Sequence, residues 1–268
     1  MIRMLNCDCM EFMAGLEDNA YELAIVDPPY GIGLCMVYDV GCHDNIHSKK
    51  QWNDAAPLEE YFKELHRISK NQIIWGCNYY AQFIPAIGRI VHDKIMSCEK
   101  TAFNFSHADI ASCSMQSRIT MFRYEWSGNR QGGSVNWNNT GTDARIHPTQ
   151  KPVALYKWLL QKYANPGDKI LDTHGGSGSI CIACYDMGYD LDWMELDADY
   201  YRDAVQRYRD HAAQGKLFEP APAETAGEQL SIPHLARVVR GDSMTLDTAR
   251  AMCDNTGEDH KPKGDKSE

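Results

Sequence analysis

The clearest pattern in the chain is a run of apolar residues that ends abruptly in an acid and two prolines. Residues 23–26 (LAIV) show no polar alternation, which predicts a strand buried on both faces of a parallel sheet. The next residues, 27–30 (DPPY), cannot extend that strand, because proline has no N–H to donate to a neighbouring strand. Asp27 and Tyr30 are therefore expected at the carboxyl end of the strand, the edge at which open α/β sheets bind ligands.

Similar patterns predict that strands and helices alternate through a folded domain of residues 1–215. A short strand and a helix are expected within 2–16, further strands at 71–76, 89–96, 109–115, 118–128, 169–172 and 189–197, and further helices at 57–70, 152–168, 180–188 and 198–215. Residues 32–57 and 127–146 lack a sustained period and are predicted to be loops. The Pro-, Ala- and Glu-rich residues 216–230 predict a linker, and residues 231–268 an acidic, flexible tail.

Composition narrows the class of protein. The N-terminus lacks an apolar signal segment and no run of about 18 apolar residues occurs, so a cytoplasmic protein without membrane contact is expected. Cys181 and Cys184 have the spacing of a zinc pair, but no second pair lies nearby, so free thiols in the core and no metal site are expected. The formal net charge of −10 argues against a general nucleic-acid coat. Residues 89–151 nevertheless hold eight basic and five acidic residues, which suits either a polyanion or an ordinary solvated surface.

The first chemical motif is the glycine-rich sequence GGSGS (residues 175–179), which follows the predicted strand 169–172. Glycines at a strand-to-helix turn let a ligand approach the backbone, and Glu195, about 20 residues later, suits the paired hydroxyls of a ribose. The dinucleotide fingerprint G-x-G-x-x-G is absent, so the motif predicts either a nucleotide site or an ordinary glycine-rich turn.

The second motif is DPPY. Asp27 beside the rigid main-chain carbonyl of Pro28 offers two acceptors for the two hydrogens of an exocyclic amine, and Tyr30 adds an aromatic face on which a base can stack. Such a base must leave its helix, as it does in enzymes that flip nucleotides. The alternative is a proline-capped strand with a chance acid and tyrosine.

The third motif, HPTQKP (residues 147–152), precedes a predicted helix. Thr149, Gln150 and Lys151 gather donors where a small carboxylate could be held by charge-assisted hydrogen bonds. The alternative is a helix cap without a ligand.

Five motifs in this order, DPPYG, IIWGCNYY, HPTQKP, ILDTHGGSGS and MELD, resemble those of the S-adenosylmethionine-dependent amino-methyltransferases of DNA, in particular the beta-ordered group. The resemblance covers roughly residues 1 to 210 and implies a circularly permuted motif order, with the catalytic half before the cofactor half. It also implies an α/β, Rossmann-like methyltransferase fold, with a seven-stranded, mostly parallel sheet, helices on both faces and an antiparallel last strand.

The resemblance implies a role for each matching residue. Asp27 and the carbonyl of Pro28 would bind the target amine, Pro29 would complete the catalytic motif, and Tyr30 would stack on the base. Residues that would bind the cofactor are Asp8 at its adenine amine, Glu195 at its ribose, Thr149 and Lys151 near its carboxylate, and Asp172, Gly176, Ser177 and Gly178 at the glycine turn. The sequence departs from the family pattern in Thr173, His174 and Cys7, where proline, phenylalanine and glycine are usual.

These inferences predict a DNA adenine N6-methyltransferase that uses S-adenosylmethionine on double-stranded DNA with a flipped adenine. Asp before Pro-Pro-Tyr is typical of the family's adenine enzymes and Ser of its cytosine N4 enzymes. The alternatives are therefore a cytosine N4-methyltransferase and, more distantly, a non-catalytic DNA-binding or RNA-modifying relative. Loops 32–57 and 127–146 are expected to read the target sequence, alone or in a homodimer, and no residue indicates a restriction partner. Contacts with DNA are expected from Lys94, Arg118, Arg123, Arg130 and Arg145.

Overall fold

The computed structural model describes residues 1–32, 55–95, 106–127, 130–131, 134–135 and 146–214. Most of the loops predicted at 32–57 and 127–146, and all of the linker and tail predicted at 216–268, lie outside these residues. The chain divides into two units, Met1–Lys216 and Leu217–Glu268, and the first contains every described residue. Within this described part, no helix is long and apolar enough to cross a bilayer.

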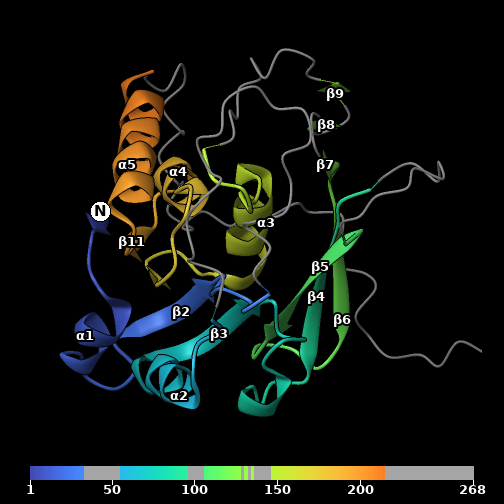
Figure 1. Cartoon of the computed structure of the whole chain (residues 1–268), viewed down its shortest axis with the longest axis vertical. Helices are drawn as coiled ribbons and strands as arrows, with labels where there is room; N and C mark the ends of the chain where they lie inside the picture. The colour runs from blue at the N-terminus through green and yellow to red at the C-terminus, as the bar shows by residue number, and fades with distance from the viewer. Residues whose placement is uncertain (33–54, 96–105, 128–129, 132–133, 136–145, 215–268) are drawn as a thin grey trace, which may run out of the picture. The chain divides into compact units, whose positions relative to one another are not determined.

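An eight-stranded sheet, in the order β1-β11-β10-β2-β3-β5-β4-β6, forms the centre of the first unit (Figure 1). Its strands are β1 (Ile2–Leu5), β2 (Tyr21–Val26), β3 (Ser69–Trp75), β4 (Gly88–Asp93), β5 (Ala108–Cys113), β6 (Ile119–Arg123), β10 (Lys169–Asp172) and β11 (Asp190–Met194). The five strands from β1 to β3 in this order are parallel. Strand β5 runs antiparallel to β3 and β4, and β6 is parallel to β4. The predicted α/β, mostly parallel fold is confirmed.

Two details of the predicted sheet are wrong. The sheet has eight strands instead of seven, because Ile119–Arg123 pairs with β4 and extends that edge. The antiparallel strand is β5, which lies between β3 and β4, whereas the last strand of the chain, β11, is parallel to β10. Both details depend on which strands become neighbours, and periodicity along the chain does not carry that information.

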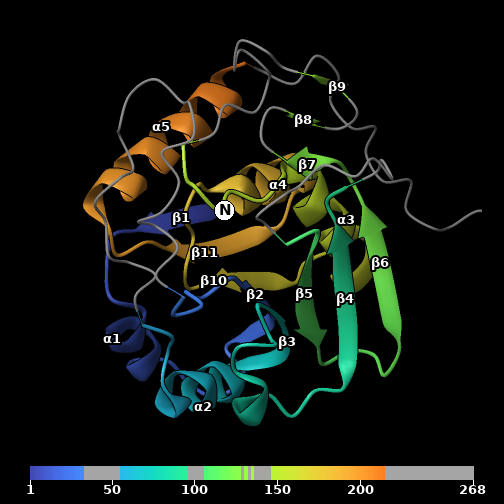
Figure 2. The same cartoon turned by 45° about the vertical axis from the view of Figure 1, so that its right-hand side comes forward.

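Helices cover both faces of the sheet, as Figures 1 and 2 show. They are α1 (Cys9–Ala14), α2 (Glu59–Ile68), α3 (Val153–Tyr163), α4 (Ser179–Met187) and α5 (Ala198–Ala213). Alternate residues of β2 enter two different cores. Leu23 and Ile25 pack with residues of α3 and α4, while Ala24 and Val26 pack with residues of α1 and α2. The apolar run therefore forms a strand that is buried on both faces, as predicted.

The cysteines of the described residues are free thiols. Cys181 and Cys184 have no exposed surface and belong to the core that includes α3 and α4. Their predicted packing role is confirmed.

A second sheet occupies part of the segment predicted to be a loop. It consists of β7 (Trp126–Ser127), β8 (Arg130–Gln131) and β9 (Ser134–Val135), which pair in antiparallel order. The loop prediction is wrong for β8 and β9, because strands of two residues leave no periodic signal, whereas β7 falls within the strand predicted at 118–128.

Candidate active site

The predicted catalytic and cofactor motifs meet at one edge of the main sheet. Asp27 follows the last residue of β2, and the glycine turn follows β10. Strands β2 and β10 are parallel neighbours, with Leu23 opposite Ile170 and Ala24 opposite Leu171. Their carboxyl ends therefore lie side by side at the edge where α/β sheets bind ligands.

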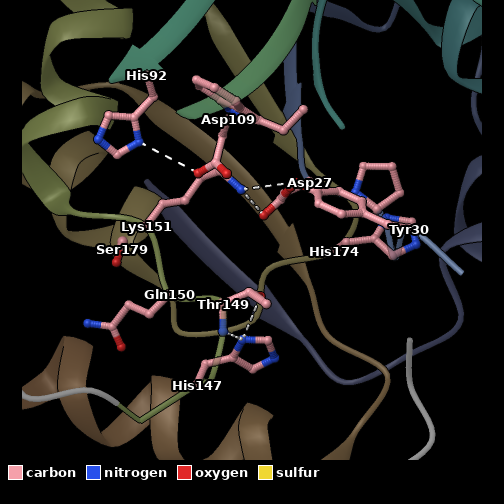
Figure 3. A network of polar contacts seen from close by, with 12 residues as sticks. Asp27, Tyr30, His92, Asp109, His147, Thr149, Gln150, Lys151, His174 and Ser179 are labelled. Atoms are coloured by element: carbon pink, nitrogen blue, oxygen red, sulfur yellow. Dashed lines mark hydrogen bonds and ion pairs between the residues drawn. The ribbon is translucent and has the colours of Figure 1, made fainter. Parts of the chain in front are cut away.

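The Asp27 carboxylate has a partner on each oxygen, as Figure 3 shows. The Tyr30 hydroxyl donates to Oδ1 at 2.8 Å, and the Lys151 ammonium donates to Oδ2. The main-chain carbonyl of Pro28 accepts a hydrogen bond of 2.9 Å from the Tyr80 hydroxyl. Because a carbonyl has two lone pairs and a carboxylate about four acceptor sites, Asp27 and Pro28 both keep capacity for a further donor.

Tyr30 is already in contact with aromatic and glycine neighbours. Its ring stacks on that of Tyr79, with 4.8 Å between centroids and an angle of 18° between planes. It also fills the space beside Gly76, where a Cβ would come within 2.2 Å of the ring. Tyr79 and Tyr80 are functional candidates for which no role was predicted from the sequence. The signal for them was available, since two tyrosines follow a buried strand and its glycine in IIWGCNYY.

The glycine turn has the backbone expected of a ligand site, but two of its glycines also serve packing. Gly176 and Gly178 have φ of +52° and +69°, a region that side chains rarely adopt. A Cβ on Gly178 would lie 3.2 Å from Cβ of Ala204 in α5, and one on Gly175 would lie 1.8 Å from the Trp193 indole. Ser177 is buried, and its hydroxyl contacts that of Ser179 at 3.1 Å.

Glu195 lies directly beside this turn. Its Oε2 accepts the N–H of Gly176 at 2.9 Å, and its Oε1 accepts the N–H of Asp197 at 2.8 Å. Burial raises the pKa of the Glu195 carboxyl, against the effect of these hydrogen bonds. About two acceptor sites of the carboxylate remain, which suits the two hydroxyls of a ribose.

Asp8 is the N-cap of α1 and accepts the N–H of Met10 at 2.7 Å. One of its oxygens therefore fixes the start of the helix.

Asp172 and His174 are two buried titratable groups at the same turn. Burial raises the pKa of Asp172 to about 8, while its Oδ1 accepts the N–H of His174 at 3.1 Å. Burial also lowers the pKa of His174 to about 4, so its ring is neutral at pH 7. The two unusual residues after Asp172 are accommodated through Tyr61, whose hydroxyl contacts Thr173 Oγ1 at 2.7 Å and whose ring packs edge-on against His174.

The HPTQKP segment forms a fixed turn before α3. Gln150 donates its N–H to the carbonyl of His147 at 3.1 Å, and its own carbonyl accepts the indole N–H of Trp126 at 2.6 Å. The His147 ring lies beside Gly176, with 3.6 Å between Nδ1 and the position of a Cβ, so this turn borders the glycine turn. Thr149 is exposed and contacts His147 Nδ1 at 3.2 Å. Lys151 is buried and points to Asp27.

The predicted DNA-binding residues do not form one group. Lys94 donates to Asp109 at 2.8 Å, whereas Arg123 is exposed at the carboxyl end of β6, 3.6 Å from Asp93. Arg118 precedes β6, so it lies where the parallel strands begin, opposite the carboxyl ends that hold Asp27. Arg130 is in β8, and Arg145 lies outside the described residues. The structure therefore does not bring Arg118 together with Lys94 and Arg123.

Asp109 connects Lys94 with the catalytic edge. Its Oδ2 is 3.8 Å from Nδ1 of the buried His92, which is too long for a hydrogen bond. Burial would raise the pKa of Asp109, but His92, Lys151 and Lys94 together hold it well below its usual value.

Comparison with known proteins supports the resemblance to the amino-methyltransferases of DNA. A family model for DNA methylases of the N6/N4 type matches residues 89–206. YubD of Escherichia coli (strain K12) is 26% identical over 220 residues, which cover 77% of this chain and 90% of YubD. The type II methyltransferase M.HpaI of Haemophilus parainfluenzae is 24% identical over 236 residues, covering 76% and 73%.

The solved structure of the PvuII DNA methyltransferase, described as cytosine-N4-specific, shares the fold with a TM-score of 0.51. It is 10% identical, and the match covers 79% of this chain and 90% of that one. With the family match, this confirms the Rossmann-like methyltransferase fold. The predicted cofactor, S-adenosylmethionine, is confirmed as that of the family. The residues present fit this cofactor. The glycine turn has a left-handed backbone, and the adjacent Glu195 carboxylate keeps about half of its acceptor sites free.

Proposed function

We propose that the chain is a DNA methylase of the N6/N4 type, the family whose model matches residues 89–206, and that it transfers a methyl group from S-adenosylmethionine to the N6 amine of adenine in double-stranded DNA. The observation that carries this proposal is the pair of acceptors after β2. The Asp27 carboxylate and the Pro28 carbonyl are adjacent in sequence and lie beside the glycine turn of the neighbouring strand. An amine held there by both hydrogens would face the methyl donor.

The two acceptors make the amine nitrogen a better nucleophile. The lone pair of an aromatic amine is delocalised into the ring, and acceptors that pull on its two hydrogens return electron density to the nitrogen. Such fixed acceptors act mainly through position and electrostatics. The bound cofactor supplies an electrophilic methyl group on a sulfonium. The nitrogen lone pair would form the new N–C bond while the electrons of the broken S–C bond stay on sulfur, and the extra proton on nitrogen would pass to water.

Side chains around the acceptors are proposed to position the base. Tyr30, held by its hydrogen bond to Asp27 and by Gly76, would stack on the flipped base through its ring. Tyr79 is stacked on that ring and is 40% exposed, so a base using this face of Tyr30 would displace it. Tyr80 orients the Pro28 carbonyl through its hydroxyl.

The choice of adenine over cytosine rests on Asp27. A carboxylate at this position resembles the adenine enzymes of the family, whereas a serine resembles the cytosine enzymes. Cytosine N4 methylation is the alternative, since the PvuII enzyme, which shares the fold, is cytosine-N4-specific.

The test is direct analysis of the product. The full chain should be incubated with S-adenosylmethionine and genomic DNA, and the DNA digested to nucleosides for mass spectrometry. N6-methyladenine without N4-methylcytosine is the expected result. N4-methylcytosine alone would overturn the choice of base, and methylation of RNA but not DNA would overturn the substrate.

A variant of Asp27 tests its role within that reaction. Asp27→Asn keeps the shape but removes the charge and one acceptor, and should lower the transfer rate on the order of 100-fold or more. Cofactor affinity by calorimetry should stay close to that of the parent. Asp210→Asn, at an exposed residue of α5, is the matched control and should retain the parent rate. Equal rates for the two variants would exclude Asp27 as the acceptor.

A further inference from the structure

Lys151 is a buried ammonium at the catalytic edge. Its side chain is 5% exposed, and its Nζ donates to Asp27 Oδ2, lies 3.5 Å from the Tyr30 hydroxyl and is 5.3 Å above the centre of the Trp75 ring. The resemblance implied that this lysine lies near the cofactor's carboxylate. In the structure it donates a hydrogen bond to Asp27, the carboxylate proposed to bind the target amine (Figure 3).

Neighbouring residues hold the backbone of Lys151 in place. The preceding residue, Gln150, is held by its hydrogen bonds to His147 and Trp126, and the following residue, Pro152, begins α3. A buried cation is costly unless it is paired and hydrogen-bonded. Because the Lys151 side chain is itself buried and its backbone is anchored on both sides, the ammonium is held beside Asp27.

Asp27 needs such a partner, because its carboxylate is largely buried among other titratable groups. Asp172 on β10 and Asp109 on β5 act electrostatically on the same set of side chains. The groups that face Asp27 or its partners are Lys151 before α3, the carboxyls of Asp172 and Asp109, and the phenols of Tyr30, Tyr80, Tyr61 on α2 and Tyr156 on α3. The Asp27 side chain is only 16% exposed, so its charge is costly to bury unless an opposite charge compensates it, and the Lys151 ammonium does so.

We propose that Lys151 is a positioning residue for methyl transfer, which keeps the Asp27 carboxylate ionised and fixes it through Oδ2 so that Oδ1 can accept the target amine. This inference rests on the proposed function, in which Asp27 binds that amine. A protonated carboxyl is a weaker acceptor than a carboxylate. The two donors also do not compete, since the ammonium uses Oδ2 and leaves an acceptor site on Oδ1, beside the Tyr30 hydroxyl, for the amine.

The first experiment measures single-turnover transfer as a function of pH, at saturating cofactor, from about pH 6 to about pH 9. Lys151→Met removes the charge and should lower the rate on the order of 100-fold near pH 7, with partial recovery as the pH rises and Asp27 loses its proton. Lys151→Arg keeps the charge and should restore a pH profile like that of the parent. Tyr30→Phe, the matched control, removes the other partner of Asp27 without a charge and should lower the rate at all pH values alike.

Two outcomes of this experiment would overturn the proposal. A Lys151→Met profile parallel to that of the parent would show that the lysine does not control ionisation of Asp27. Cofactor affinity that falls by tenfold or more in calorimetry, with an unshifted profile, would show that Lys151 is a cofactor ligand.

A second experiment tests the pair without any activity. Thermal unfolding of Lys151→Met, of Asp27→Asn and of the double variant forms a double-mutant cycle. Each single change leaves a group without its partner, so the double variant should lose less in melting temperature than the two losses added together. Additive losses would overturn the pairing itself. If the parent methylates neither DNA nor RNA, the proposed function fails, while this cycle still reports on Lys151.

Discussion

The indole of Trp193 fills the space that a side chain on Gly175 would need. A Cβ at Gly175 would lie 1.8 Å from both Nε1 and Cε2 of Trp193, which has no exposed surface. This first glycine of the turn is therefore required by β11 behind it, independently of any ligand.

Gly175→Ala should lower the free energy of unfolding by about 1–3 kcal/mol, because overpacking must displace a buried ring. Gly188→Ala is a useful comparison, since Gly188 has φ of +78° and open space beside it, and the substitution costs only backbone strain. Trp193→Phe should relieve part of the first cost and none of the second. Urea unfolding of the single and double variants measures this, and additive effects for Gly175→Ala with Trp193→Phe would argue against the clash.

Asp172 should make stability depend on pH in a direction unusual for an acid. Burial raises its pKa to about 8 in the folded protein, above the unfolded value near 3.9, so its contribution to stability is complete below about pH 4 and is lost as pH rises toward 8. Asp172→Asn keeps an acceptor for the N–H of His174 and removes this loss. The variant should gain stability over the parent between about pH 5 and about pH 8, by at most about 1.4 kcal/mol per pH unit.

Asp192 offers a control of opposite sign for that experiment. Burial would raise the pKa of Asp192, but hydrogen bonds from Arg3, Tyr21 and Lys169 hold it below its usual value. Its contribution is present at neutral pH and is lost in acid, so Asp192→Asn should be most destabilising above about pH 4. Denaturant unfolding at several pH values measures both variants. Parallel curves for Asp172→Asn and the parent would show that Asp172 does not titrate in this range.

Glu195 should contribute to cofactor affinity through the oxygens that the backbone leaves free. Glu195→Gln loses the charge and one acceptor, and should weaken binding of S-adenosylmethionine in calorimetry by about tenfold or more, since hydrogen bonds to charged groups contribute about 1.5–3 kcal/mol. Glu22→Gln is the control, because Glu22 also accepts a main-chain N–H, that of Lys169 at 2.9 Å, at the opposite edge of the sheet. Equal affinities in the two variants would remove Glu195 from the cofactor site.

Arg123 and Arg118 should differ in their effect on DNA binding. Arg123 is exposed at the carboxyl end of β6, on the side of Asp27, whereas Arg118 precedes the same strand at the other edge. Arg123→Ala should flatten the slope of log affinity against log salt by about 0.9, the value for one phosphate contact, on target and scrambled duplexes alike. Arg118→Ala should leave the slope unchanged, and the reverse result would place the DNA on the other edge.

The sequence carried those features of the fold that depend on neighbours along the chain. The uninterrupted apolar residues 23–26 identified a buried strand, and the prolines after it identified the edge where Asp27 lies. The position of β5 between β3 and β4 had no such signal, because strand order follows from packing among distant segments.

The candidate site divides in the same way. Asp27 and the glycine turn were found from local motifs, whereas the pairing of Lys151 with Asp27 joins residues that are 124 positions apart. From the sequence alone, a lysine beside a proline could donate to any nearby anion. Only the turn built by His147 and Gln150 determines which carboxylate it reaches.

The two acceptors after β2 also bear on how the proposed enzyme releases its product. An unmethylated amine has two hydrogens for Asp27 and the Pro28 carbonyl, whereas the methylated amine has only one. The product therefore leaves one acceptor without a donor, at a cost of about 1–3 kcal/mol if water cannot replace it. Methylated DNA is then held less tightly than unmethylated DNA, which favours turnover and opposes a second transfer to the same nitrogen.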